Sequence, residues 1–316
     1  MALDPQTKMV LDQLAAAGMP SLETIPLEQA RMAQTMPQAG EPEPVGKVEN
    51  RTIPGPDGEI PVRVYYPKDA KDTNPGLVYY HGGGWVLGNL DSHDAICRSI
   101  TNHANCVTIS VDYRLAPENK FPAAVEDAYA SVKYVYDHAE EFQVDRAQIA
   151  VGGDSAGGNL AAVVTHMAKE KKTPEICYQL LLYPSTAAGA PPTQSRIENA
   201  EGYFLTGSMM DWFYKCYVNS DEDKSNPLFT PMFFEDFNGL PPAIVITAEF
   251  DPLRDEGEAY AKKLEEAGVE VECIRYDGTI HGFASMAAVL DLGKDALEKA
   301  GKGLKKAFSK AAGVIG

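Results

Sequence analysis

Hydrophobic and polar positions along the chain alternate between two patterns. Short, nearly continuous hydrophobic runs are typical of strands buried on both faces of a parallel sheet, and longer stretches with helical spacing separate them. The predicted strands are Leu77–Tyr80, Val107–Val111, Ile149–Val151, Gln179–Tyr183, Ala243–Thr247 and Val269–Tyr276. The predicted helices are Ala123–Phe142, Ala156–Lys171, Glu256–Ala267 and a C-terminal stretch from about Ala284. Strand alternating with helix predicts a doubly wound α/β sheet.

The N-terminal part of the chain departs from this rhythm. Residues 1 to about 45 show two short helical patterns and then a connector rich in Pro, Gly and Glu, from Gly40 to Gly46. Val45–Ile53 and Ile60–Tyr66 follow with alternating residues, and the turn signal Pro56-Asp57-Gly58 lies between them. This pattern predicts an antiparallel hairpin. We therefore expect about eight strands in one mostly parallel sheet that starts with a hairpin.

A second interruption runs from Ala187 to Pro231, where no strand pattern occurs. A helical pattern covers about 208–218, and several aromatic residues gather around it. They are Tyr203, Phe204, Trp212, Phe213, Tyr214 and Tyr217. An insertion of this length inside a compact domain is typical of a lid or a binding element.

Composition narrows the classes of function. The chain has 316 residues and 44% hydrophobic residues, which suits one large α/β domain. Its formal net charge of −17 argues against binding to nucleic acid. The five cysteines show no paired spacing and are interpreted as free thiols in a reducing compartment. With no signal peptide and no hydrophobic stretch long enough to span a membrane, we expect a soluble cytoplasmic protein.

The segment Gly153-Asp154-Ser155-Ala156-Gly157 matches the G-x-S-x-G motif and lies between a predicted strand and a predicted helix. In this context the motif places a serine on a sharp turn with its hydroxyl exposed. The alternative is a serine that caps the helix, followed by small residues that pack. The chain contains no glycine-rich phosphate-binding motif, so a nucleotide site is not expected.

About seventy residues earlier lies the run His81-Gly82-Gly83-Gly84. Glycines leave backbone N–H groups unobstructed, which an oxyanion acceptor requires. The N–H of Ala156, at the start of the predicted helix, faces outward in the same way. We expect Gly83, Gly84 and Ala156 to donate to an oxyanion, with His81 and Trp85 supporting the loop. His81 has no partner at metal-ligand spacing, and neither a metal nor a cofactor is expected.

A serine hydroxyl needs a neighbouring base and a carboxylate that orients it. His281 follows the last predicted strand in a loop, where a catalytic histidine can reach a nucleophile; the alternative is an ordinary surface histidine. Four other histidines fall in helical patterns, which favours solvent exposure or a helix-end role: His93, His103, His138 and His166. Asp251 directly follows the strand Ala243–Thr247 and is the preferred acid. Asp255 competes, although its place at a helix start already explains a negative charge.

These residues, in this order, resemble the hormone-sensitive-lipase-type family of α/β-hydrolase esterases, the bacterial family IV carboxylesterases. Six further segments match the family: Asp112–Glu118, Phe121–Ala124, Gly152–Leu160, Leu182–Pro184, Asp251–Gly257 and His281–Phe283. The nucleophile motif is that of the G-D-S-A-G subgroup. The resemblance implies an α/β-hydrolase fold, a triad of Ser155, Asp251 and His281, and oxyanion donors at Gly83, Gly84 and Ala156. It also implies one domain, 1–316, whose helical cap comprises about 1–45 and about 187–230.

Family members mostly hydrolyse esters with short to medium acyl chains, so the expected partner is a small-molecule ester, without nucleic acid or membrane. Apolar residues near the site are candidates for lining its pocket, with ordinary packing of the cap as the alternative. They are Trp85, Phe204, Leu205, Met209, Met210 and Phe213. An amidase, formamidase or thioesterase with the same triad stays open, as does a non-catalytic ligand receptor, although such receptors have lost the histidine. The sequence does not distinguish a monomer from a homodimer.

Overall fold

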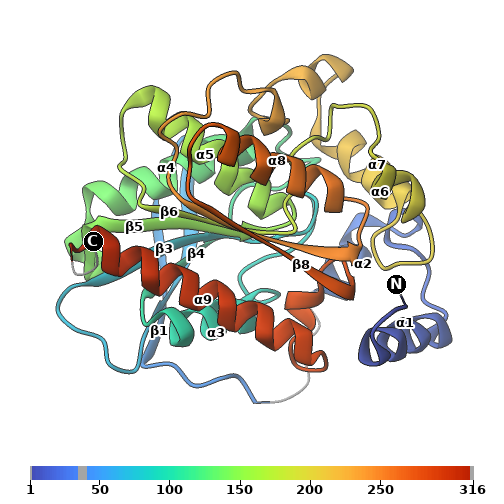
Figure 1. The fold of residues 1–316 in the computed structure, drawn as a ribbon, viewed down its shortest axis with the longest axis horizontal. Helices are drawn as coiled ribbons and strands as arrows, with labels where there is room; N and C mark the ends of the chain where they lie inside the picture. The colour runs from blue at the N-terminus through green and yellow to red at the C-terminus, as the bar shows by residue number, and fades with distance from the viewer. Residues whose placement is uncertain (1, 35–40, 314–316) are drawn as a thin grey trace.

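A computed structural model describes residues 2–34 and 41–313 of the chain. Its centre is an eight-stranded sheet in the order β1-β2-β4-β3-β5-β6-β7-β8 (Figure 1). The strands are β1 Lys47–Gly55, β2 Gly58–Tyr66, β3 Asn74–Tyr80, β4 Val107–Val111, β5 Val144–Asp154, β6 Tyr178–Leu182, β7 Ala243–Phe250 and β8 Val271–Ile280. Strand β2 pairs antiparallel with β1 and β4, and every other pairing is parallel. The expected parallel sheet with an antiparallel hairpin at its start is confirmed.

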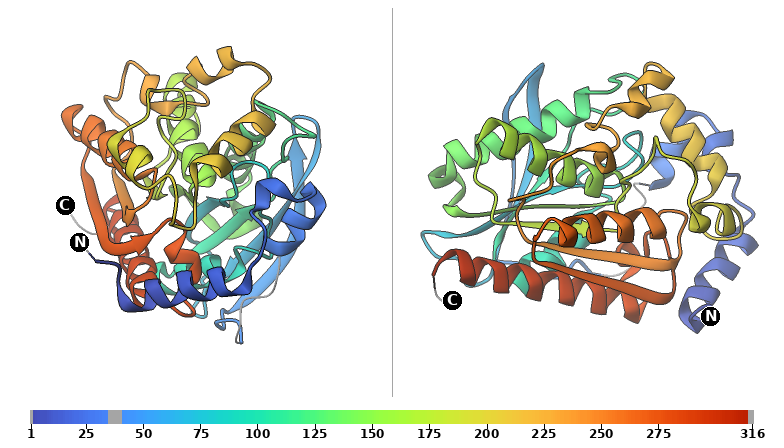
Figure 2. Two further views of the ribbon diagram at one scale, coloured as in Figure 1. Left: turned by 90° about the vertical axis from the view of Figure 1, so that its right-hand side faces the viewer. Right: turned by 45° about the horizontal axis from the view of Figure 1, so that its top comes forward.

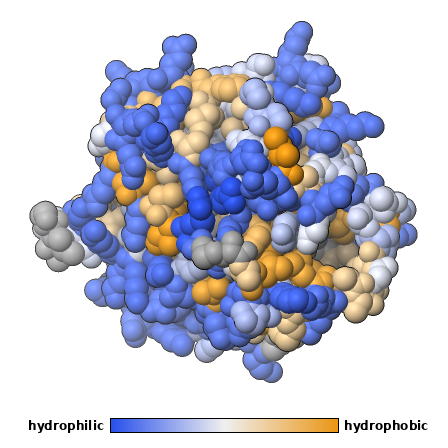
Figure 3. Space-filling view, turned by 45° about the vertical axis from the view of Figure 1, so that its right-hand side comes forward, coloured by the Kyte–Doolittle hydropathy of each residue, from blue (hydrophilic) through white to orange (hydrophobic). Residues whose placement is uncertain are grey.

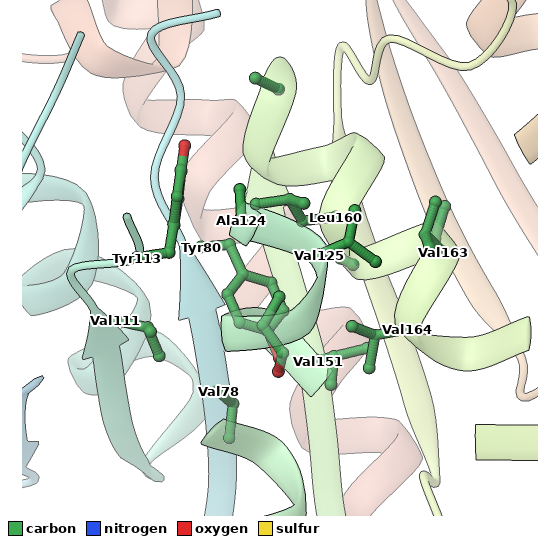
Figure 4. Close-up of a cluster of buried hydrophobic side chains, with 14 of the residues drawn as sticks. Val78, Tyr80, Val111, Tyr113, Ala124, Val125, Val151, Leu160, Val163 and Val164 are labelled. Carbon is green, nitrogen blue, oxygen red and sulfur yellow. The ribbon is translucent and has the colours of Figure 1, made fainter. Parts of the chain in front are cut away.

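Helices cover both faces of the sheet, which explains the continuous hydrophobic runs in its strands. In β3, Leu77 and Tyr79 pack in the cluster that includes α3 and α9, whereas Val78 and Tyr80 pack on the opposite face with α4 and α5. Figure 4 shows part of this second cluster, where Leu160 and Val164 of α5 face Val151 and Tyr80. The main helices of the two layers are α3 Asp94–Ala104, α4 Ala123–Asp137, α5 Ala156–Lys171, α8 Arg254–Glu266 and α9 Asp291–Ala311.

Four elements differ from those predicted. The helical pattern noted around His93 and His103 corresponds to α3, whose bounds were not predicted. The helix predicted over Ala123–Phe142 ends at Asp137, because His138 leaves the helical region at φ −117°, and a 3₁₀ turn covers Ala139–Phe142. The last strand runs on to Ile280, and the C-terminal stretch divides into a 3₁₀ turn at Phe283–Met286 and α9. Gly40, where the predicted connector begins, lies outside the described residues.

Most of the remaining helices gather at the end of the sheet that holds the carboxyl ends of the parallel strands, whereas η4 packs on α5 (Figures 1 and 2). They are α1 Pro5–Ala17, η1 Leu22–Thr24, α2 Leu27–Gln34, α6 Gln194–Glu198, α7 Gly207–Tyr217, η3 Asp221–Ser225 and η4 Pro231–Phe233. The N-terminal helices and the helices between β6 and β7 are in contact, because Ser208 Oγ of α7 donates a hydrogen bond to Glu23 of η1. Hydrophobic patches lie among hydrophilic residues on this side of the molecule (Figure 3). In the described ranges, no helix has the length and hydropathy needed to cross a membrane.

Candidate active site

Ser155 occupies a sharp turn between β5 and α5. Its backbone has φ 56° and ψ −117°, a conformation that costs a non-glycine residue about 1–3 kcal/mol. Glycines on both sides make the turn possible, because a Cβ on Gly153 or Gly157 would lie 2.5 Å or 1.9 Å from the carbonyl oxygen of Tyr80. The side chain of Ser155 is half-buried. The strand-turn-helix context predicted for the motif is confirmed.

His281 and Asp251 reach Ser155 from neighbouring strands of the sheet. Each directly follows a parallel strand, His281 after β8 and Asp251 after β7, so both lie at the same sheet edge as Ser155. His281 Nε2 is 2.9 Å from Ser155 Oγ, and His281 Nδ1 is 2.7 Å from Asp251 Oδ2. Asp251 is fully buried and its other oxygen accepts a hydrogen bond from the N–H of Leu253. The imidazole thus connects a hydroxyl to a fixed carboxylate.

Asp255, the competing carboxylate, has different partners. Its Oδ2 accepts a hydrogen bond from the N–H of Ser195 at 2.7 Å, and its Oδ1 accepts one from Arg254 Nε at 2.8 Å. Partial burial acts to raise the pKa of Asp255, but the Ser195 N–H and the Arg254 guanidinium hold it below its usual value. Asp255 therefore fixes α6 against the start of α8.

The glycine loop after β3 presents backbone donors next to Ser155. Gly83, Gly84 and Trp85 take positive φ angles of 116°, 61° and 60°, and the carbonyl of Gly83 accepts hydrogen bonds from Val86 and Leu87. Within residues 2–34 and 41–313, no group accepts a hydrogen bond from the N–H of Gly83, Gly84 or Ala156. These N–H groups are available to an oxygen on a bound molecule.

Asp154, next to Ser155, anchors this loop, a role that the sequence analysis did not assign. Its buried carboxylate accepts hydrogen bonds from Tyr79 Oη at 2.8 Å, Gly82 N at 3.0 Å and His93 Nε2 at 3.2 Å. Burial acts to raise the pKa of Asp154, but His93 and these hydrogen bonds hold it below its usual value. A charged residue at the end of a buried strand needs hydrogen-bond partners. The position of Asp154 in the motif, directly after the hydrophobic strand, could therefore have indicated this role.

Two histidines near the loop are buried. His93 is at the N-cap position of α3, so the expected helix-end location is confirmed, but its ring faces Asp154 rather than solvent. His81 is fully buried and stacks on Tyr113 at 4.3 Å, and burial lowers its pKa to about 3. His81 is therefore neutral and supports the loop by packing. His166 is also buried and lies inside α5, which differs from the solvent exposure or helix-end role expected for it.

The candidate pocket residues divide into two groups. The ring of Phe213 lies directly over Gly84, 2.3 Å from the place where a Cβ would stand, and Phe204 approaches Gly282, the neighbour of His281, at 3.4 Å by the same measure. Trp85 instead stacks on Tyr217 at 4.7 Å and is 1% exposed, which favours support of the loop over contact with a substrate. Leu205, Met209 and Met210 are buried.

Comparison with known proteins shows the family to which the chain belongs. A profile of the α/β-hydrolase fold family matches residues 77–285. The chain belongs to this family. It is 44% identical over 294 residues to the carboxylic ester hydrolase LipN of Mycobacterium tuberculosis, covering 90% of this chain and 77% of that protein. It is 39% identical over 311 residues to the carboxylesterase NlhH of the same organism, covering 97% and 96%.

A similar solved structure is an ester hydrolase from the metagenome of Lake Arreo in complex with a derivative of bipyridine phosphonate. It superposes with a TM-score of 0.94 at 43% identity and covers 97% of this chain and 99% of that one. The α/β hydrolase described here is thus an enzyme of the hormone-sensitive-lipase type, as its motifs indicated. Its candidates Ser155, Asp251 and His281 follow one another in the chain order usual for α/β hydrolases.

Proposed function

We propose that this α/β hydrolase is a carboxylesterase that cleaves short- to medium-chain acyl esters through an acyl-enzyme on Ser155. The observation that carries the proposal is the hydrogen-bonded line from Ser155 Oγ through His281 to Asp251, with distances of 2.9 Å and 2.7 Å. The names of the curated relatives, a carboxylic ester hydrolase and a carboxylesterase, support esters as the substrate class. A ligand receptor is disfavoured because the imidazole is in place.

The proposed reaction has two steps. Ser155 Oγ attacks the ester carbonyl while His281 Nε2 takes its proton, and the alcohol then leaves with that proton. Water attacks the acyl-enzyme by the same route, which releases the acid and restores Ser155. Asp251 accepts a hydrogen bond from His281 Nδ1 and stabilises the imidazolium that forms between the proton transfers.

Each attack converts the carbonyl oxygen into an oxyanion, which must be stabilised. The N–H groups of Gly83, Gly84 and Ala156 are proposed to donate to it, because no described residue occupies them and their loop is anchored beside Ser155 through Gly82 and Asp154. Removing one such donor typically lowers the rate by about a hundredfold to a thousandfold.

We further propose that the segments of about 1–45 and about 187–230 form a helical cap over the site within a single domain. The contacts of Phe213 with Gly84 and of Phe204 with Gly282 support this arrangement. Together with Leu205, Met209 and Met210, these two side chains are proposed to bound an apolar pocket for a small ester, since such pockets are mostly apolar.

A panel of matched substrates tests the substrate class. Purified enzyme is assayed with p-nitrophenyl acetate, butyrate, octanoate and laurate, with the p-nitroanilide of butyric acid and with the S-(4-nitrophenyl) thioester of butyric acid. We expect the largest kcat/KM for the acetate, butyrate or octanoate ester and very slow turnover of the anilide. A larger kcat/KM for the anilide or the thioester would assign the enzyme to amides or thioesters instead.

A further inference from the structure

Arg31, on helix α2 near the N-terminus, reaches into the main body of the molecule. Its Nε donates a hydrogen bond to the carbonyl of Val86 at 3.0 Å, and its Nη2 donates one to the carbonyl of Ala116 at 2.9 Å. The same guanidinium pairs with both carboxylate oxygens of Glu118 at 2.8 Å. One side chain therefore satisfies two main-chain carbonyls and one carboxylate.

Both carbonyls belong to backbone that supports the glycine loop. Val86 follows the loop directly, and its N–H donates to the carbonyl of Gly83 at 3.1 Å. The N–H of Ala116 donates to the carbonyl of Trp85 at 2.9 Å. Arg31 thus donates hydrogen bonds to the carbonyls of Val86 and Ala116, and the N–H groups of these same two residues donate hydrogen bonds to the loop.

The loop needs support of this kind because its backbone is unusual. Trp85 has a φ of 60°, and a bulky residue in that region is strained by about 1–3 kcal/mol. Such a conformation persists only where surrounding contacts determine it from several sides. The ring of Trp85 is held by Tyr217, and Arg31 supplies contacts on its main-chain side from a segment more than fifty residues away.

Helix α2 is itself fixed in place. Ala30, the residue before Arg31, is fully buried in the same hydrophobic cluster as Val86 and Leu87. The position of the guanidinium is therefore fixed at one end by the packing of α2 and at the other by its own hydrogen bonds.

We propose that Arg31 is a positioning residue of the oxyanion hole. By holding the carbonyls of Val86 and Ala116, it keeps the N–H groups of Gly83 and Gly84 directed at the reacting carbonyl. This inference rests on the proposed function. The pair with Glu118 orients the guanidinium and contributes little itself, because the Glu118 side chain is 54% exposed.

Arginine is required in this role. Its planar group presents donors in a fixed fork that contacts two carbonyls and a carboxylate at once. A lysine ammonium keeps the charge but is a single point of contact on a flexible stem. The change Arg31→Lys therefore removes the forked set of donors and keeps the positive charge. Glu118→Gln removes the negative charge of the ion pair and keeps the contacts of Arg31 with the two carbonyls.

The test compares the wild-type enzyme with Arg31→Lys and Glu118→Gln. Three quantities are measured: kcat and KM for p-nitrophenyl butyrate, the inhibition constant of phenylboronic acid, and the melting temperature. Phenylboronic acid forms a tetrahedral adduct with an active serine, so its affinity reports on the oxyanion hole, which a purely structural role would not change. Wild-type turnover is established first, because its absence overturns the proposed function itself.

We expect Arg31→Lys to lower kcat about tenfold with little change in KM, a smaller loss than follows from removing a donor outright. The affinity for phenylboronic acid should fall by a similar factor, and Glu118→Gln should match the wild type. The inference is overturned if Arg31→Lys lowers only the melting temperature. It is also overturned if both variants lose the same activity, since the ion pair would then be responsible.

Discussion

His281 Nδ1 lies 2.7 Å from Asp251 Oδ2, whereas the carboxylate of Asp255, four residues further along, contacts Ser195 and Arg254. The two acids differ in place because Asp251 directly follows β7, whereas Asp255 lies in the first turn of α8. Their separate partners assign them separate work: Asp251 orients the imidazole, and Asp255 holds α6 in position.

This separation predicts opposite effects of two isosteric substitutions. Asp251→Asn should lower kcat about ten-thousandfold, because an amide does not hold the imidazole in the required tautomer. Asp255→Asn should keep most of the activity and lower the free energy of unfolding by about 1–3 kcal/mol, because the amide has no charge and one oxygen acceptor fewer for the hydrogen bonds from Ser195 and Arg254. Both quantities are measured on the same preparations. Comparable losses of activity in the two variants would contradict the assignment.

The contact between Gly84 and Phe213 predicts that their substitutions are coupled. In Gly84→Ala the new methyl group meets the Phe213 ring and displaces the loop, so we expect kcat to fall about a hundredfold. Phe213→Ala removes the obstacle, and the double variant should recover part of the lost activity. Additive losses across the double-mutant cycle would show that the ring does not press on this loop.

The proposed acyl pocket predicts a change in chain-length preference. Phe204→Ala and Met209→Ala, measured separately across the p-nitrophenyl series, should shift the preferred acyl chain towards longer esters because each enlarges the apolar space. Met19→Ala, on an exposed side chain of the same side of the molecule, is the control. An unchanged preference in both variants would assign these side chains to packing of the cap.

Glu256 predicts a pH dependence of stability. Burial raises its pKa from 4.5 to about 7, although the N–H groups of Ala187 and Thr186 act against this rise. Between these two values the folded protein keeps a proton that the unfolded chain has lost, so this group's contribution to stability falls as the pH rises through that window. The loss is on the order of 3 kcal/mol, and it is complete above about pH 7.

The isosteric change Glu256→Gln tests this directly, since an amide does not ionise. The free energy of unfolding of the variant, relative to the wild type, should rise when the pH is raised from about 5 to about 8. Unfolding by urea at both values measures the difference. An identical pH dependence in the two proteins would show that Glu256 ionises normally.

Much of the sheet was predictable because strands buried on both faces leave a continuous hydrophobic signal, as in Val107–Val111. The candidate site was predictable for a related reason. Ser155, Asp251 and His281 each directly follow a strand, and the carboxyl ends of parallel strands meet at one edge. Helical spacing was recognised around His93 and His103, but the bounds of helix α3 were not predicted, although its buried residues follow that spacing.

Contacts between distant segments left no such signal. Phe213 lies on Gly84 because α7 returns over the sheet, and nothing in its local sequence fixes that place. In the sequence, Arg31 is an ordinary charged residue of a helix, and nothing near it indicates its hydrogen bond to the carbonyl of Val86. The two acids show this limit of the sequence most clearly. The sequence favoured Asp251 only because the position of Asp255 at a helix start already explained its charge, whereas the structure distinguishes them by the hydrogen bond from His281 to Asp251.

The most direct test of the account is the turnover of p-nitrophenyl butyrate by Ser155→Ala, next to the wild type. The wild-type enzyme should hydrolyse this ester, and the variant, folded and with the same melting behaviour, should lose about a millionfold in kcat, as other triad knockouts do. Retention of even about a tenth of the activity would contradict an acyl-enzyme on Ser155.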